Sequence, residues 1–328
     1  MDTSTHIIMG VTLGGLAHLD PMVSNDPTLA QAVLTGTIVG SNAPDFDYFI
    51  KLFKGNGMYI EHHRGLSHSL PFLLIWSLLI TSFLYMFFPS ISVLHLFFWI
   101  SLSVVIHVVV DIFNPYGTQA GRPITKKWLS LNAVPLFDPY LFLIHLIGIA
   151  FWIYGYQPKN IFTFVYGISL IYFIYRLFLS YKIKQFIAKS CEKYERIVVI
   201  PTMRLNVWNF IVEGKEGFEV GKIDSDTITW LHYFPKHNDY STAIQIAMND
   251  KNVRHFLANS DCPYPVEIQT RNGIEVRFID LRFRNKNHYP YMAVVLLNKN
   301  YTIQSSYTGW IHHTNQIPKY LNPVAIEQ

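Results

Sequence analysis

The stretch Ile106-His107-Val108-Val109-Val110-Asp111-Ile112-Phe113-Asn114-Pro115 decides how this chain folds and where its chemistry can occur. It ends a long apolar run in which His107 and Asp111 are among the very few ionisable side chains. Residues four apart lie on one face of a helix, so the imidazole and the carboxylate point the same way. A carboxylate near a hydrocarbon core costs about 2.5–3.5 kcal/mol on insertion scales, so it rarely lies there without a partner. The pair indicates an apolar helix that offers two ligands to a metal ion.

The composition indicates a membrane protein that carries a soluble part. Hydrophobic residues make up 50% of the 328 residues and charged residues 15%, whereas about 25% of an ordinary soluble protein is charged. The net charge of +4 requires no nucleic-acid partner, because cytoplasmic loops of membrane proteins collect Lys and Arg. Cys191 and Cys262 form no CxxC pair, which favours a reducing compartment. The first residues lack the basic region of a signal peptide and are expected to remain in the mature protein.

Four apolar segments are long enough to cross a bilayer, which takes about 20 residues. They cover about 70–88, 91–113, 140–156 and 161–181, and short connections pair them as two helical hairpins. The main basic groups, within 51–64, 122–127 and 182–193, fall on one side of an even number of spans. The positive-inside bias makes that side cytoplasmic. We therefore predict a multi-pass membrane protein with its N-terminus and C-terminal part in the cytoplasm.

The expected fold class is an α-helical membrane bundle followed by a small, mainly antiparallel β (α+β) cytoplasmic domain. The membrane-embedded, metal-binding part covers 1–182 and the soluble, β-rich part 183–328. Two helical stretches before the first span, 7–19 and 28–40, are too mixed to cross alone and are expected to pack against the bundle. After 193, β-branched and aromatic runs predict strands, and one stretch predicts a helix at 243–258. The expected strands are 196–201, 208–212, 227–231, 275–280 and 293–297.

Further imidazoles and carboxylates precede the first span and should lie near the same cytoplasmic interface. The complete set of candidate metal ligands is His6, Asp45, Asp47, His63, His68, His107 and Asp111. Imidazole and carboxylate without thiolate suit one or two ions of Zn, with Mn or Fe as alternatives. Such an ion activates a bound water near neutral pH, and two ions can clamp a displacement at phosphorus. Arg64 or Asn114 could hold the charge that develops on a phosphoryl oxygen.

Each candidate also has a simpler explanation. His107 and Asp111 could be a buried hydrogen-bonded pair, and Asp45 with Asp47 could cap a helix or form a turn. Arg64 could anchor the first span at an anionic leaflet. His62 could meet lipid headgroups, and His145, single in an apolar run, is expected to be a packed residue rather than a ligand. The metal hypothesis rests on the convergence of these residues on one side of the membrane.

Several motifs in about the first 180 residues resemble the YdjM-like family of bacterial membrane-bound metal-dependent hydrolases. The motifs are Thr5-His6, Pro44-Asp45-Phe46-Asp47, His63-Arg64-Gly65-Leu66-Ser67-His68-Ser69, His107-x3-Asp111 and Asn114-Pro115-Tyr116-Gly117. That family is distantly similar to zinc-dependent phospholipase C and the S1/P1 nucleases, which are helical enzymes that cleave phosphodiesters with a zinc cluster. The resemblance therefore implies a location in a bacterial inner membrane and a phospholipase C-like helical core.

The resemblance also implies roles for individual residues. It makes Asp111 a bridging ligand and Asp45 a zinc ligand and catalytic proton acceptor, with His68 or His63 and an early histidine, His6, as further ligands. The distant relatives also use the amino group of an N-terminal Trp and a late histidine-x3-glutamate pair. Here Met1 precedes His6, and His145 is followed by Ile149. The expected site therefore holds two metals rather than three.

Three functions remain open at this point. The first is a membrane-bound metal-dependent hydrolase that cleaves a phosphoester at the cytoplasmic face, with membrane lipid as its surroundings and a phospholipid-like substrate. The second is a non-enzymatic regulator with a structural metal, whose β domain binds a protein through exposed aromatics; the candidates are Tyr289, Tyr291, Tyr307 and Trp310. The third, a metal or proton transporter, is disfavoured because the candidate ligands gather at one interface.

Overall fold

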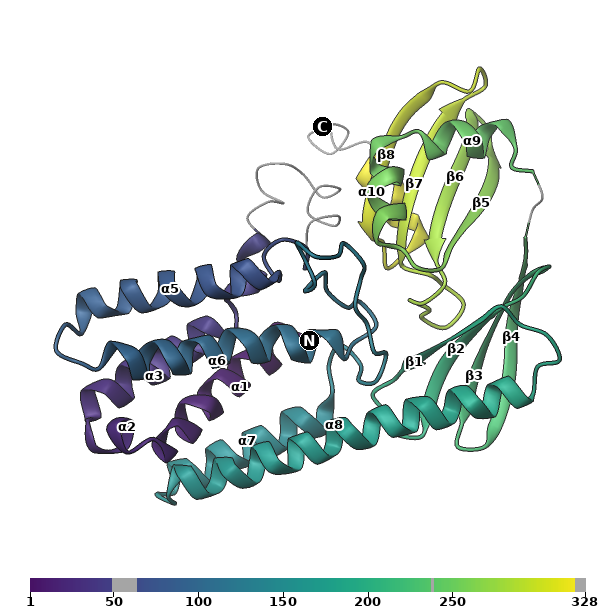
Figure 1. Cartoon of the computed structure of the whole chain (residues 1–328). Helices are drawn as coiled ribbons and strands as arrows, with labels where there is room; N and C mark the ends of the chain where they lie inside the picture. The colour runs from purple at the N-terminus through teal and green to yellow at the C-terminus, as the bar shows by residue number, and fades with distance from the viewer. Residues whose placement is uncertain (49–63, 237–238, 322–328) are drawn as a thin grey trace.

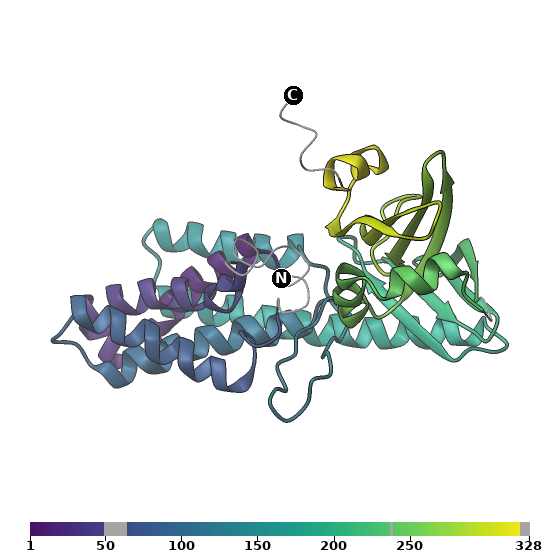
Figure 2. The same cartoon turned by 90° about the horizontal axis from the view of Figure 1, so that it is seen from above.

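The computed structural model describes residues 1–48, 64–236 and 239–321. A helical bundle and two β-sheets lie at opposite ends of an elongated molecule, and one long helix runs from the bundle to the sheets (Figures 1 and 2). The N-terminus lies at the end of the bundle that faces the sheets (Figure 1).

Six main helices form the bundle. They are α1 (Thr3–Leu16), α3 (Pro27–Gly40), α5 (Leu70–Phe87), α6 (Val93–Ile112), α7 (Pro139–Ile153) and α8 (Pro158–Lys189), with the short α2 (Pro21–Asn25) and the 3-10 helix η2 (Ala43–Tyr48) between them. Among the described residues, α5, α6 and α8 are long and apolar enough to cross a membrane. The apolar α7 has 15 residues, so it rises only about 22 Å and falls short of a hydrocarbon core of about 30 Å. Within the part of the chain that the structure describes, three helices rather than four therefore meet the length that a span requires.

The bundle helices begin at well-formed caps. α3 and α7 each have an Asp at the N-cap followed by Pro at the first helical position, where the missing N–H of Pro costs nothing. The carboxylate of Asp138 accepts hydrogen bonds from the backbone N–H groups of Tyr140 (3.0 Å) and Leu141 (3.1 Å). α1 and α3 pack closely at Gly10, where a Cβ would lie 2.8 Å from the carbonyl oxygen of Thr37.

The C-terminal half contains two separate antiparallel sheets, each with its strands in sequence order. The first consists of β1 (Arg196–Pro201), β2 (Val207–Glu213), β3 (Gly217–Asp224) and β4 (Thr227–Pro235). The second consists of β5 (Pro263–Thr270), β6 (Gly273–Asp280), β7 (Tyr291–Asn298) and β8 (Ile303–Trp310). The helices α9 (Thr242–Met248) and α10 (Lys251–Asn259) cover one face of the second sheet, and α11 (Ile317–Leu321) follows β8.

Successive side chains of a strand point to opposite faces of its sheet, and in this way the sheets and α8 pack on one another in layers. In β1, Ile197 and Val199 pack with Ile187 of α8, whereas Val198 packs toward Met292 of the second sheet. The first sheet therefore lies between α8 and the second sheet, and β1 is buried on both faces. This double burial explains why Arg196–Pro201 reads as an unbroken apolar run rather than an alternating one.

The antiparallel sheet architecture was predicted, but three details of the soluble part were wrong. In its described residues, the region expected to be one β domain holds two sheets, and eight strands replace the five expected. The helix expected at 243–258 is two helices, because Asp250 caps a new one by accepting hydrogen bonds from the N–H groups of Asn252 (2.8 Å) and Val253 (3.3 Å). In addition, α8 continues past 182, the expected end of the membrane part, to Lys189.

Candidate metal centre

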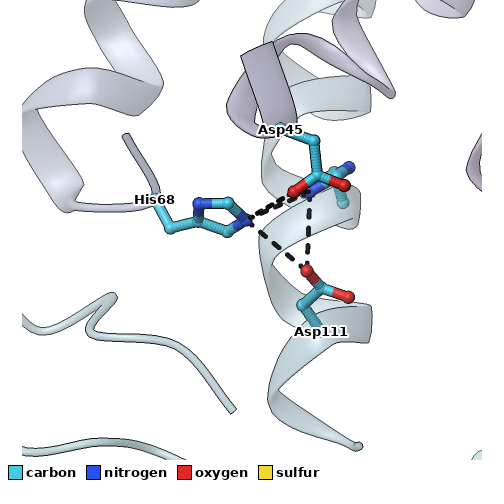
Figure 3. A group of neighbouring side chains, drawn as sticks. Asp45, His68 and Asp111 are labelled. Atoms are coloured by element: carbon cyan, nitrogen blue, oxygen red, sulfur yellow. Dashed lines mark hydrogen bonds and ion pairs between the residues drawn. The ribbon is translucent and has the colours of Figure 1, made fainter. Parts of the chain in front are cut away.

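Four side chains that lie far apart in the sequence meet at the end of the bundle. Asp45, His68, His107 and Asp111 each offer one ligand atom, and these four atoms all lie within 4.8 Å of one another. Asp45 comes from η2, His68 from the turn before α5, and the other two from one face of α6 (Figure 3). The four-residue spacing on α6 thus presents an imidazole and a carboxylate together, as helical geometry requires.

The separations within the cluster match a single coordination sphere. His68 Nε2 lies 3.2 Å from His107 Nε2 and 3.5 Å from an oxygen of both Asp45 and Asp111. His107 Nε2 lies 3.6 Å from the same two carboxylate oxygens. Ligands that surround a zinc ion tetrahedrally at 2.0–2.1 Å are about 3.3 Å apart. The donor set, two nitrogens and two oxygens, therefore fits a transition metal such as Zn, Mn or Fe.

Contacts at Nδ1 orient both histidines. His107 Nδ1 donates to the carbonyl oxygen of Ser41 at 2.6 Å, which fixes the proton on Nδ1 and leaves the lone pair on Nε2. His68 Nδ1 lies 3.0 Å from the hydroxyl of Ser67. Such outer contacts are how proteins set the tautomer of a metal-binding histidine. Both Nε2 atoms therefore point into the cluster.

The carboxylates present unsatisfied oxygens to the same point. Within the part of the chain that the structure describes, Asp45 Oδ1 and Asp111 Oδ2 are buried and accept no hydrogen bond. Buried polar atoms without a partner are rare, because each costs about 1–3 kcal/mol. A cation that takes up these lone pairs removes the cost.

Burial and charge keep His68 and Asp45 in the protonation states that metal binding requires. Burial lowers the pKa of His68 to about 3, so its imidazole is neutral at neutral pH. Burial alone would raise the pKa of Asp45, but its interactions with His107, and then with His68 and Arg64, outweigh this effect and hold the pKa well below the ordinary value. Neutral imidazole and ionised carboxylate are the binding forms of these groups.

A second group of atoms surrounds the other oxygen of Asp111. The ring of His6 stacks on His107 at 3.8 Å between centroids, and its Nε2 lies 3.3 Å from Asp111 Oδ1. The amino group of Met1 contacts His6 Nε2 at 3.0 Å and forms an ion pair with Asp111. The two oxygens of Asp111 thus face different sets of nitrogen atoms.

Arg64 and Asn114 lie beside the cluster. Arg64 Nε is 3.4 Å from Asp111 Oδ2, and its Nη1 donates to Asn114 Oδ1 at 3.2 Å. Asn114 Nδ2 donates to Asp111 Oδ1 at 3.2 Å. Asp111 is therefore the centre of the network: its Oδ2 faces the guanidinium together with His68 and His107, and its Oδ1 faces the amide together with His6 and the amino group.

The remaining candidates are placed differently. His62 and His63 lie outside the described residues, and Asp47 belongs to η2 but its side chain is likewise outside them. His145 is buried elsewhere in the bundle, where its Nδ1 lies 2.7 Å from the hydroxyl of Thr12 and its Nε2 3.3 Å from that of Ser169.

Three groups at the centre were not among the residues predicted from the sequence. The amino group of Met1 and the carbonyl of Ser41 belong to the backbone, so no residue type marks them. Tyr116 lies within the motif Asn114-Pro115-Tyr116-Gly117, and the guanidinium of Arg64 lies 5.5 Å from its ring centroid. Its position in that motif was the available signal.

A bundle with membrane-length helices and a buried imidazole–carboxylate cluster defines a membrane protein with a candidate metal site. Residues 1–183 match the family described as YdjM inner membrane protein, and residues 242–321 match the YfhP C-terminal alpha/beta plait domain. The chain is also 43% identical over 324 residues to the uncharacterized protein YfhP of Bacillus subtilis (strain 168), covering 98% of each. The chain belongs to the YdjM family.

No solved structure matches the chain significantly, so the distant similarity to phospholipase C and the S1/P1 nucleases gains no support. Residues 242–321 are called the plait domain below.

Proposed function

We propose that this protein is a membrane-bound metal-dependent hydrolase that cleaves a phosphoester at the cytoplasmic face. The observation that carries the proposal is the partial exposure of one ligand side chain, that of Asp45, whose ligand oxygen Oδ1 is buried. The side chain of Asp45 is 21% exposed, whereas those of His68, His107 and Asp111 are 0% exposed. Structural zinc sites are closed, whereas catalytic sites keep one position open to water or substrate.

The surroundings of the cluster favour a phosphoryl group as the substrate. When bound, a metal ion would lower the pKa of a water and polarise a phosphoryl oxygen. Arg64 is held next to Asp111 by Asn114 and by the carbonyl oxygen of Met1, 3.2 Å from its Nη2. A guanidinium fixed in this way binds phosphate oxygens well and stabilises charge that develops on them. In this proposal Asp45, the partly exposed ligand, accepts a proton.

The position of the cluster along α6 favours a lipid substrate. Asp111 is the penultimate residue of α6, so the site lies where that helix ends, at the level expected for headgroups. The C-terminal ends of α6 and α8 point toward the two sheets (Figure 1). Basic residues gather within 122–127 and 182–193 at this end, and the positive-inside bias supports a cytoplasmic location for it.

A regulator with a structural metal is the second candidate. It is favoured by the dense packing around Asp111, where Met1 and Asn114 contact Oδ1 and Arg64 lies at Oδ2. The partial exposure of Asp45 favours the hydrolase. A measurement of substrate turnover distinguishes the hydrolase from the regulator.

The test is a hydrolysis screen of phosphodiesters and phospholipids with the detergent-purified, Zn-loaded protein. We expect Asp111→Ala to lose more than about 100-fold in rate, because changes outside the ligand shell already cost about 10–100-fold. His145→Ala, which removes a buried histidine outside the cluster, should retain activity. Equal rates for wild type and Asp111→Ala on every substrate would contradict the proposal.

A further inference from the structure

The loop that follows α6 is held by the plait domain. The ring of Tyr116 stacks on Phe283 with a centroid distance of 4.5 Å and an angle of 22°, and it lies 6.1 Å from the ring of Trp310. Beside this stack, Arg282 Nη1 donates to the carbonyl oxygen of Pro115 at 3.2 Å. Two consecutive residues of the loop are therefore fixed by two consecutive residues of the plait domain.

The other side of the same loop faces the metal centre. Tyr116 lies 5.5 Å from the guanidinium of Arg64, a distance at which a cation is attracted to the ring face. Asn114 Oδ1 accepts hydrogen bonds from the N–H groups of Tyr116 (2.9 Å) and Gly117 (3.2 Å), while Nδ2 of the same amide donates to Asp111. Thus the conformation of the loop determines where Asn114 and Arg64 stand relative to Asp111.

The plait side of this contact is rigid. Arg282 is buried and pairs with Asp280, Nη2 to Oδ2 at 2.7 Å, and Nη2 also donates to the carbonyl oxygen of Asn259 at 3.1 Å. Phe283 packs against Trp310 at 5.4 Å and Tyr291 at 5.5 Å. A guanidinium held by two partners within the plait domain and an aromatic held by two give a preformed socket for Pro115 and Tyr116.

The contact also corrects an expectation about the aromatics of this domain. Tyr289 and Tyr291 were considered as exposed residues that bind a protein partner, but they are 6% and 4% exposed. Tyr291 and Trp310 instead belong to the aromatic group that receives Tyr116. The chain itself occupies this surface.

We propose that the plait domain positions the metal centre of its own chain. Its socket holds Pro115 and Tyr116, and this fixes Asn114 and Arg64 beside Asp111. Tyr116 and Arg282 are positioning residues, since they act on the ligand Asp111 through Asn114 and Arg64. The inference deepens the proposed function, because it assigns the second domain a role at the same site.

The test measures the affinity of the full-length, detergent-purified chain for Zn²⁺ by competition with a chelator. Tyr116→Leu removes the stack on Phe283 and the cation–π contact, and we expect the dissociation constant to rise about 10-fold, as for other changes outside a ligand shell. Tyr116→Phe keeps the ring and should restore wild-type affinity. The matched control is Tyr307→Leu, since Tyr307 also stacks on an aromatic within the plait domain, Tyr320, at 4.6 Å.

A second measurement, hydrogen exchange of the metal-free chain, separates this proposal from the proposed function. We expect amides within 116–119 to exchange faster in Tyr116→Leu and at the wild-type rate in Tyr307→Leu. The positioning role would be overturned if the amides of Tyr116→Leu exchanged at the wild-type rate. It would also be overturned if they exchanged faster while the Zn²⁺ affinity of this variant stayed unchanged. If the wild-type chain bound no Zn²⁺, the proposed function and the role at a metal centre would both fail, whatever the exchange. If Zn²⁺ affinity falls as expected but no substrate is cleaved, the positioning role stands and the hydrolase does not.

Discussion

The carbonyl oxygen of Ser41 accepts a 2.6 Å hydrogen bond from Nδ1 of His107. This bond joins the end of α3 to the ligand-bearing face of α6 and fixes the tautomer of the imidazole. The geometry of the candidate metal centre therefore depends on how closely the bundle helices pack, and not only on the ligands.

Substitution of Gly10 should disturb the centre from a distance. A Cβ at Gly10 would lie 2.8 Å from the carbonyl oxygen of Thr37 and would also contact Ser41 Oγ, so Gly10→Ala must move α1 away from α3. We expect a loss of about 1–3 kcal/mol, typical of overpacking, together with a lower zinc content. Thermal unfolding in detergent and metal analysis check both effects.

The matched control is Gly167→Ala, because a Cβ there meets nothing within 4 Å. This change should leave zinc content intact and stabilise the helix by up to about 1 kcal/mol. Equal stability and equal zinc content of Gly10→Ala and Gly167→Ala would argue against close packing of α1 on α3.

Arg176 should be important for the stability of the junction between bundle and sheet. Its Nε donates to the carbonyl oxygen of Ala133 at 2.8 Å, and its guanidinium lies 4.4 Å from the ring centroid of Trp208 in β2. Arg176→Met should cost about 1.5–3 kcal/mol, the usual contribution of a hydrogen bond to a charged group. Lys182→Met, also on α8 but exposed, should cost no more than about 1 kcal/mol. The account would be contradicted if chemical denaturation showed a larger loss of stability for Lys182→Met than for Arg176→Met.

Cys262 should make the stability of the protein fall in alkali. Burial raises the pKa of its thiol from the ordinary 9.0 to about 12. The unfolded chain therefore loses this proton at lower pH than the folded chain, so the contribution of the thiol is present below pH 9 and is lost as pH rises toward 12. Cys262→Ala should show a smaller decrease in melting temperature between pH 8 and pH 10.5 than wild type. An identical decrease would indicate that the thiol is accessible in the folded protein.

The sequence predicted the elements whose patterns are strong and local. The apolar lengths of α5, α6 and α8 and the doubly buried run at Arg196–Pro201 were recognisable because burial there leaves few polar residues. β3, β5 and β8 were missed for particular reasons. Gly217 and Gly221 interrupt β3, Pro263 and Pro265 interrupt β5, and β8 is partly exposed with polar residues near its start. The division of the strands between two sheets was not predictable, because the sequence of a strand does not indicate which sheet it joins.

The candidate ligands were predictable by residue type, but their arrangement was not. His107 and Asp111 share a helical face, which spacing alone predicts. The approach of Asp45 and His68 requires the tertiary packing of η2 and the turn before α5. The contact of Tyr116 with Phe283 joins residues of different domains, so no local pattern reports it.

Metal analysis of the detergent-purified protein tests the central claim most directly. Wild type should carry about one equivalent or more of tightly bound transition metal, with zinc the expected ion, because a preformed set of deprotonated ligands binds it strongly. His68→Ala should lose this metal, whereas His145→Ala should keep it, although both remove a buried histidine from the bundle. A wild-type protein without stoichiometric metal, or a His68→Ala variant with the wild-type content, would contradict the account.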